Sequence, residues 1–334
     1  MKMATLYVFN PEHDLALAAN LRHFTSPLAG RQLRAALGWL PALWASESDY
    51  ILVNDVATAM SSWEHARDRL GFADAPRQFV AKTALSRLPI DRVDPWGWDL
   101  AIKYELMRSG VAAGLLPSDD ALAAIRLLSH RRTAVQLLQQ LQGPGLVGQS
   151  FEQFDAELPP YPCVIKAPWS SSGRGVRFCD AARLVNSEAL IVNNWMRHVI
   201  KTQGSVIVEP YYNKVKDFGM EFYAHADGRV TYLGLSVFAT RNGTYLDNIV
   251  APEAEKLDML TPYVSADLLQ FVRAEICRRM APIINHRYDG CFGVDMMVVK
   301  GDTGYLLHPC VEVNLRRTMG WVALAPRRRG GLLH

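Results

Sequence analysis

A lysine followed by a loop of small residues carries the clearest chemistry in this sequence. Residues 164–175 read Val-Ile-Lys-Ala-Pro-Trp-Ser-Ser-Ser-Gly-Arg-Gly, so an apolar strand ends near Lys166 and a serine- and glycine-rich loop follows Pro168. Such a loop leaves many backbone N–H groups free to surround an anion, and the lysine adds a positive charge. The segment favours a polyphosphate ligand, although a Walker A motif has its lysine after the glycines. Taken alone, it equally fits a hairpin turn between strands 163–167 and 175–178.

A second group of polar residues lies in the last third of the chain. Residues 291–299 predict an apolar strand with one acid, Asp295, and residues 304–314 predict a second strand that ends in Glu312 and Asn314. The Gly-Asp-Thr-Gly segment between them is typical of a hairpin turn. Because Glu312 and Asn314 are two residues apart, they share one face of their strand, and the hairpin can bring Asp295 beside them. Two carboxylates and an amide oxygen suit Mg²⁺ that also holds phosphates. Solvated positions on a one-sided sheet are the alternative, and the apolar neighbours weigh against it.

These motifs, taken in order, resemble those of the ATP-grasp enzymes. The resemblance covers about residues 126–325 and depends on four segments, which are the Val-Ile-Lys-Ala-Pro strand with its loop, Val-Glu-Pro-Tyr-Tyr at 208–212, Asp295, and Glu-Val-Asn-Leu-Arg at 312–316. It implies an α/β protein with the ATP-grasp fold, in which two α+β subdomains hold a nucleotide between two sheets.

The resemblance also implies how the nucleotide is bound. Lys166 would contact the phosphates, and the 170–175 loop would cover them as a flap. Glu209 would accept a hydrogen bond from the adenine amino group, and Asp217 would hold the ribose, with Glu221 as the alternative. The residues assigned to ATP binding are Arg132, Lys166, Ser170, Ser171, Ser172, Gly173, Gly175, Glu209, Pro210, Tyr211 and Asp217.

Arginines are expected at three places around the phosphates. Arg132 stands where the family usually has a lysine, and the neighbouring Arg131 is the alternative. Arg316 would face the γ-phosphate or the acceptor carboxylate. Arg241, at the end of a strand that begins at Val230, is suited to stabilising developing phosphate charge, although a solvated loop arginine is an equal alternative. One or two Mg²⁺ ions, for which Mn²⁺ is a substitute, would be bound by Asp295, Glu312 and Asn314.

Composition limits the class of protein. The chain has 334 residues, of which 49% are hydrophobic and 21% charged, with a net charge of +3. This charge is too small to indicate a nucleic-acid partner, and the short apolar run at residues 6–9 predicts neither a signal peptide nor a membrane span. The five cysteines have no CxxC spacing, so they predict reduced thiols in a cytoplasmic protein.

Alternating strand and helix patterns organise the first part of the chain. They predict a small parallel-sheet α/β domain at 1–125, ahead of the ATP-grasp domain at 126–325, whose subdomains divide at about residue 208. A basic C-terminal tail is expected at 326–334. A Trp cluster at 95–99 predicts a packing element at a domain junction, with a sugar or aromatic platform as the alternative.

The loop after the first strand is the candidate acceptor site. Loops at the carboxyl ends of parallel strands are where α/β proteins bind ligands, so Asn10, His13 and Asp14 are expected to meet the acceptor substrate. The alternative is that Glu12 and its neighbours only start a helix, with Asn10 as its N-cap.

The function expected from these features is ATP-dependent ligation. A carboxylate would be activated as an acyl phosphate and attacked by an amine, or by a thiol, with release of ADP and phosphate. A small-molecule kinase and a catalytically inactive nucleotide-binding protein are the alternatives. The acceptor would be a small molecule or a peptide, and the resemblance also allows a homodimer.

Overall fold

The computed structural model divides the chain into two compact units. The first unit comprises residues 1–126 with 324–334, and the second comprises residues 127–323. The described residues are 3–70, 77–170, 175–180, 186–241 and 244–329. Within these ranges, no helix is long and apolar enough to cross a lipid bilayer.

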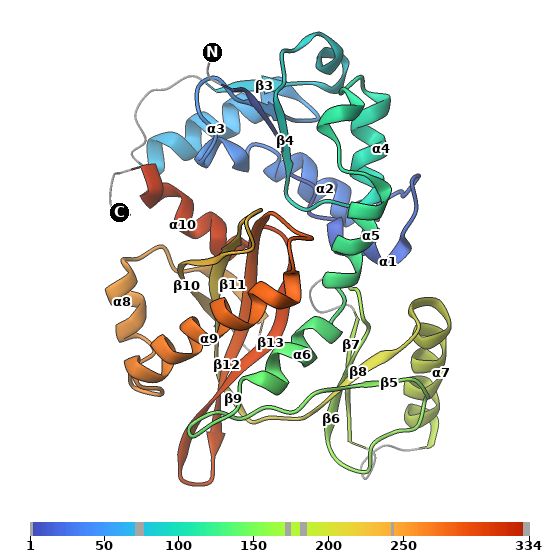
Figure 1. The fold of residues 1–334 in the computed structure, drawn as a ribbon, viewed down its shortest axis with the longest axis vertical. Helices are drawn as coiled ribbons and strands as arrows, with labels where there is room; N and C mark the ends of the chain where they lie inside the picture. Colours follow the sequence, from blue (N-terminus) through green and yellow to red (C-terminus); the bar gives the residue numbers. More distant parts are fainter. Residues whose placement is uncertain (1–2, 71–76, 171–174, 181–185, 242–243, 330–334) are drawn as a thin grey trace. The chain divides into compact units, whose positions relative to one another are not determined.

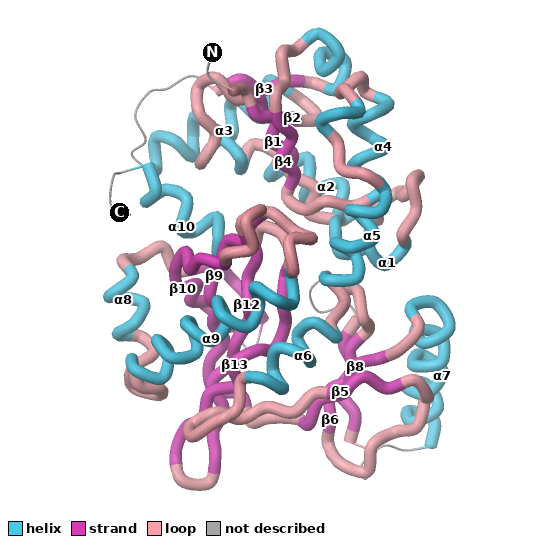
Figure 2. The backbone as a smooth tube through the Cα atoms, in the orientation of Figure 1, coloured by secondary structure: helices cyan, strands magenta, loops and turns pink. Residues whose placement is uncertain are grey.

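The first unit is built on a four-stranded parallel sheet (Figures 1 and 2). Its order is β3-β2-β1-β4, and its strands are β1 (Thr5–Val8), β2 (Tyr50–Leu52), β3 (Gln78–Val80) and β4 (Arg92–Pro95). Strands β1, β2 and β3 agree with the alternating strand and helix pattern of this part of the chain, whereas β4, with the short, polar sequence Arg-Val-Asp-Pro, shows no strand pattern of its own. Leu6, Val8 and Leu52 are buried in the core, together with Ile102 and Leu106 from a neighbouring helix.

Crossover segments connect the strands of this sheet, as parallel pairing requires. They contain α1 (His13–Ala19), α2 (Leu28–Leu37) and a 3₁₀ turn at Leu40–Leu43 between β1 and β2, α3 (Val56–Leu70) between β2 and β3, and a 3₁₀ turn at Lys82–Arg87 between β3 and β4. Helix α4 (Leu100–Arg108), a 3₁₀ turn at Ala113–Leu115 and α5 (Asp119–Leu128) follow β4. Helix α4 begins at a true N-cap, because a carboxylate oxygen of Asp99 accepts a hydrogen bond from the backbone N–H of Ile102 at 2.9 Å.

The second unit contains a five-stranded antiparallel sheet of order β11-β10-β9-β12-β13. The strands are β9 (Lys214–Ala224), β10 (Val230–Arg241), β11 (Thr244–Asn248), β12 (Gly290–Gly301) and β13 (Gly304–Asn314). The predicted hairpin is confirmed, since β12 and β13 pair from Gly301 opposite Gly304. Strand β11 was not predicted, because its sequence reads as part of a polar loop.

The two faces of this sheet differ in polarity. Phe218, Met220 and Phe222 of β9 are buried on one face, opposite Met296, Val294 and Phe292 of β12. Helix α9 (Ala266–Ile284), capped by the Ser265 hydroxyl, contacts β9 and β10. The intervening residues, among them Asp217, Glu221 and Asp295, point to the other face because side chains alternate along a strand. The alternation therefore gathers acids on one face of the sheet.

A four-stranded antiparallel sheet of order β5-β8-β6-β7 completes the second unit. Its strands are β5 (Phe151–Gln153), β6 (Cys163–Lys166), β7 (Val176–Cys179) and β8 (Val206–Pro210). Helix α7 (Asn186–Gln203) packs Val192, Met196 and Val199 into the core of this sheet. Helices α6 (Arg132–Gln140) and α8 (Glu253–Asp258) belong to the same unit, and Figure 1 shows α6 and α9 together over the larger sheet. The last helix, α10, runs over Met319–Arg329, so residues 326–329 of the expected tail are helical.

Candidate active site

A buried ion pair joins the two candidate nucleotide-binding strands of the smaller sheet. Lys166 ends β6 and lies opposite Ile207 of β8, two residues before Glu209. Its Nζ donates to Glu209 Oε1 at 2.6 Å, and both side chains are less than 9% exposed. Burial raises the pKa of Glu209, and Lys166 acts against that rise. The same Nζ donates to the carbonyl oxygen of Val311 at 3.3 Å, so Lys166 also reaches strand β13 of the larger sheet.

Arg131 makes the second connection between the sheets. Its guanidinium donates to the carbonyl oxygen of Ala167, to Ser170 Oγ at 2.8 Å and to Glu312 Oε1 at 2.7 Å. Its neighbour Arg132, which the sequence analysis favoured, is 44% exposed and pairs with Glu152 at 2.8 Å. The geometry therefore places Arg131, the alternative considered from sequence, among the candidate site residues. The sequence alone could not show which of the two adjacent arginines faces the site. That choice depends on where helix α6 begins.

The base of the serine-rich loop is closed by backbone contacts. The N–H of Ala167 donates to the carbonyl oxygen of Gly175 at 2.7 Å. A Cβ on Gly175 would lie 2.3 Å from Cβ of Ser170, so only glycine fits there. Ser171, Ser172 and Gly173 lie outside the described residues.

The candidate metal ligands come together on the β12–β13 hairpin. Asp295 pairs directly opposite Glu312, and Asn314 donates through Nδ2 to Asp295 Oδ2 at 3.0 Å. Arg316 donates in turn to Asn314 Oδ1 at 3.0 Å. Burial and the nearby Glu312 raise the pKa of Asp295 to about 7.

This arrangement fits a divalent cation. Two carboxylates that disfavour each other's charge would both be stabilised in their ionised form by a cation beside them. Among the described residues, no group of three or more His, Cys, Asp or Glu side chains could hold a metal. A set of two carboxylates and one amide matches Mg²⁺, which commonly takes one or two protein carboxylates and completes its shell with water and phosphate oxygens.

Two further acids lie on the polar face of β9. Asp217 pairs with Lys214 Nζ at 2.6 Å. Glu221 is 3% exposed and accepts from Thr318 Oγ1 at 2.7 Å, while its Oε2 has no hydrogen-bond partner among the described residues. Burial raises the pKa of Glu221 to about 8. The sequence analysis named Glu221 only as an alternative to Asp217. The position of this acid between the apolar residues Met220 and Phe222 already indicated a functional role.

The remaining candidates of this unit are placed as follows. Pro210 ends β8, and Tyr211 is 57% exposed with its ring edge-on to Phe178 at 4.8 Å between centroids. The N–H of Tyr211 donates to the carbonyl oxygen of Pro162. Arg241 is the last residue of β10 and pairs in register with Thr244.

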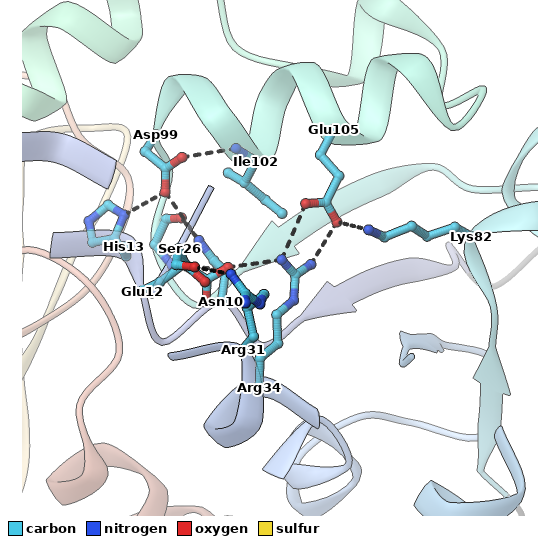
Figure 3. A network of polar contacts seen from close by, with 11 residues as sticks. Asn10, Glu12, His13, Ser26, Arg31, Arg34, Lys82, Asp99, Ile102 and Glu105 are labelled. Atoms are coloured by element: carbon cyan, nitrogen blue, oxygen red, sulfur yellow. Dashed lines mark hydrogen bonds and ion pairs between the residues drawn. The ribbon is translucent and has the colours of Figure 1, made fainter. Parts of the chain in front are cut away.

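Two of the candidate acceptor residues, Asn10 and His13, belong to a buried network in the first unit (Figure 3). Asn10 Nδ2 donates to the carbonyl oxygen of Gly97 at 2.8 Å and to Asp99 Oδ2 at 3.2 Å. Nδ1 of His13 lies 3.1 Å from the same Asp99 oxygen, and Asp14 sits in the first turn of α1. The structure thus brings Asn10 and His13 together on Asp99. Sequence reasoning missed Asp99 because its partners are almost ninety residues away.

Comparison with known proteins supports the fold. No protein-family model and no curated protein sequence matches the chain. Among solved structures, the biotin carboxylase domain of *Hydrogenobacter thermophilus* 2-oxoglutarate carboxylase, crystallised as a dimer with MgADP, ADP and bicarbonate, matches with a TM-score of 0.51 at 13% identity. The match covers 99% of this chain and 70% of that one.

Two other structures are similar over most of the chain. *Staphylococcus aureus* N5-carboxyaminoimidazole synthetase with ADP has a TM-score of 0.46 at 13% identity, covering 95% of this chain and 71% of the other. *Campylobacter jejuni* biotin carboxylase has a TM-score of 0.47 at 14% identity, covering 96% and 71%. The sheet order, the hairpin and the first of these three matches agree with the sequence-based expectation: the chain has the ATP-grasp fold.

Proposed function

We propose that this protein is an ATP- and Mg²⁺-dependent ligase that joins a carboxylate to an amine, or to a thiol. The observation that carries the proposal is the convergence of two buried cations on acids of two sheets. Lys166 contacts Glu209 and the backbone of β13, and Arg131 contacts Glu312 and the base of the serine-rich loop. A nucleotide phosphate would replace carboxylates as the partner of these cations, which is a favourable exchange for lysine and arginine.

Each group has a role that follows from its chemistry. Lys166 and Arg131 would neutralise the phosphates, and Glu209, released from Lys166, would accept a hydrogen bond from an adenine amino group. Asp295, Glu312 and Asn314 would hold Mg²⁺, which neutralises charge on the transferring phosphoryl group when it is bound. Arg316, whose guanidinium donates to Asn314, would face the γ-phosphate or the acceptor carboxylate. The resemblance assigns the ribose to Asp217. Arg241, from its position at the end of β10, is suited to stabilising developing phosphate charge.

The proposed reaction has two steps. A carboxylate oxygen attacks the γ-phosphorus of ATP, so an acyl phosphate forms and ADP leaves. The amine nitrogen then attacks the acyl carbon, phosphate leaves, and the nitrogen loses a proton. Positioning and electrostatic stabilisation supply the catalysis, with no covalent bond to the protein. The ADP, Mg²⁺ and bicarbonate in the similar biotin carboxylase domain support this choice of ligands, and its dimer supports a homodimer here.

A product assay tests this function. ADP and phosphate release from MgATP would be measured with pooled amino acids, dipeptides, hydroxy acids and sugars, using Glu312→Gln as the blank. Release that requires a carboxylate and an amine together is the expected result. ADP formation without free phosphate would identify a kinase instead, and folded protein that binds ATP without turnover on any pool would contradict the ligase proposal.

A further inference from the structure

The first unit contains a small cavity beside the buried network of Figure 3. Its volume is about 50 Å³, enough for a few water-sized groups. Charged side chains dominate its lining, and they are Glu12, Arg22, Arg34, Asp99, Glu105 and Arg108. The cavity lies where the chain leaves β1 and β4, at the carboxyl ends of two adjacent parallel strands, which is a common place for ligands in α/β folds.

The inner wall has more acceptors than donors. Arg34 is shared between Glu12 Oε1 at 2.9 Å and Glu105 at 2.8 Å, and Lys82 supports Glu105 at 2.8 Å. Asp99 accepts all of its hydrogen bonds from groups of its own network. Glu12 is different, because its Oε2 is buried without a hydrogen-bond partner among the described residues. An unsatisfied buried carboxylate oxygen is costly, so this oxygen favours a ligand that brings a donor.

The balance of charge favours a cationic donor. The lining as a whole holds three carboxylates and three arginines, but on its buried side Glu12, Asp99 and Glu105 have Arg34 as the arginine among them. Lys82, outside the lining, pairs with Glu105. Burial also raises the pKa of Glu12, since only part of its charge is compensated by Arg34. An ammonium group would supply both the missing positive charge and the missing hydrogen bond.

The outer part of the cavity has the opposite charge. Arg22 is 58% exposed and is paired with Asp119 at 2.9 Å. Arg108 is exposed, and its Nη1 lies 3.3 Å from Nδ1 of His23. Two exposed guanidinium groups beside a cavity are suited to a carboxylate, which they can bind with several donors.

We propose that this cavity binds a small amino acid as a zwitterion, with its ammonium group toward Glu12 and its carboxylate toward Arg22 and Arg108. All residues that line this binding site belong to the first unit. Its use as the source of the amine or the carboxylate in ligation rests on the proposed function.

Equilibrium binding without ATP tests the site separately from the ligase reaction. The common L-amino acids and β-alanine would be titrated into the full-length protein by calorimetry, with propylamine and propionate as probes that carry one charge each. At least one amino acid should bind saturably, and both single-charge probes should bind at least about tenfold more weakly. No binding by any amino acid, or equal binding by propylamine, would overturn the proposal.

Two variants locate the binding. Glu12→Gln keeps the size of the side chain but replaces the free acceptor with an amide, and Arg108→Ala removes an exposed outer cation. Each should weaken amino-acid binding by at least about tenfold, while Glu64→Gln and Arg69→Ala, exposed changes on α3, should leave it unchanged. Unchanged affinity in folded Arg108→Ala and Glu12→Gln would contradict the site, whatever the outcome of the ATP assays.

Discussion

The two units both bury charged side chains, but they satisfy them differently. In the first unit, Asp99 accepts hydrogen bonds from Asn10, from the backbone of Ile102 and from the imidazole of His13. In the second unit, Asp295 accepts a hydrogen bond from the amide of Asn314 and lies opposite another acid, Glu312.

This difference separates a structural network from a ligand site. A carboxylate with several donors is stabilised by the fold itself, whereas a buried carboxylate next to a second one requires a proton or a cation. Burial raises the pKa of Asp295 to about 7 and that of Glu221 to about 8, so in the second unit these acids need either a proton or a nearby cation. The same reasoning applies on a smaller scale to Glu12 in the first unit.

The largest effect is expected from removing the charges that face the nucleotide. Glu312→Gln and Lys166→Ala should each lower ATP turnover by roughly 10³-fold, because positioned charges supply most of the stabilisation in phosphoryl transfer. Turnover would be measured with a coupled ADP assay on folded protein. Glu255→Gln and Lys201→Ala, which alter exposed residues of the same unit, are matched controls that should retain wild-type rates.

The next largest effect is on the stability of the first unit. Asp99→Ala leaves Asn10 and His13 without their shared acceptor and removes the N-cap of α4, so the free energy of unfolding should fall by about 3–5 kcal/mol. Urea denaturation measures this. The exposed Asp68→Ala should change it by less than about 0.5 kcal/mol. A similar small loss in Asp99→Ala would show that the network does not hold the fold together.

Two neighbouring arginines sharpen the comparison. Arg131→Ala should reduce turnover by about 10²-fold, since its guanidinium joins Ser170 to Glu312. Arg132→Ala removes a half-exposed pair with Glu152 and should alter turnover less than about threefold. Equal losses in the two variants would contradict the assignment of Arg131 to the site.

The effect that is smallest at each step of its measurement is a pH dependence of stability in the second unit. Burial raises the pKa of Glu221 from 4.5 to about 8, so over that range the folded protein holds a proton that the unfolded chain releases. This contribution to stability is complete at low pH and is lost as the pH rises through about 8, with a slope of up to about 1.4 kcal/mol per pH unit.

The comparison variant for this slope is Glu221→Gln. Denaturation midpoints across the same pH range should depend less on pH in Glu221→Gln than in the wild type, whereas Glu255→Gln should keep the wild-type slope. If the denaturation midpoints of all three proteins change equally with pH, Glu221 does not hold a proton in the folded protein.

Much of the fold could be predicted because local patterns and global packing agree. The apolar runs around Lys166 and Asp295 are recognisable in the sequence, and the Gly-Asp-Thr-Gly turn sets the β12–β13 register from Gly301 to Met297. Strand β4 and strand β11 were missed because their polar sequences are ordered by pairing with neighbours rather than by their own pattern.

The candidate site was predictable in outline but not in its contacts. Strand alternation put Glu312 and Asn314 on one face, but Asp295 lies opposite Glu312 through a register shift between Asp295 and Met297. The choice between Arg131 and Arg132 depends on where α6 begins. The link from Asn10 to Asp99 spans two strands that are distant in sequence, and no local pattern encodes such a pair.

Nucleotide binding tests the central claim most directly. ADP would be titrated calorimetrically into the wild type, Lys166→Ala and Lys201→Ala, with and without Mg²⁺. The wild type and Lys201→Ala should bind ADP more tightly with Mg²⁺, and Lys166→Ala should bind it at least about tenfold more weakly. Absence of ADP binding in the folded wild type, or equal affinity in Lys166→Ala, would contradict the assignment of the nucleotide site to the second unit.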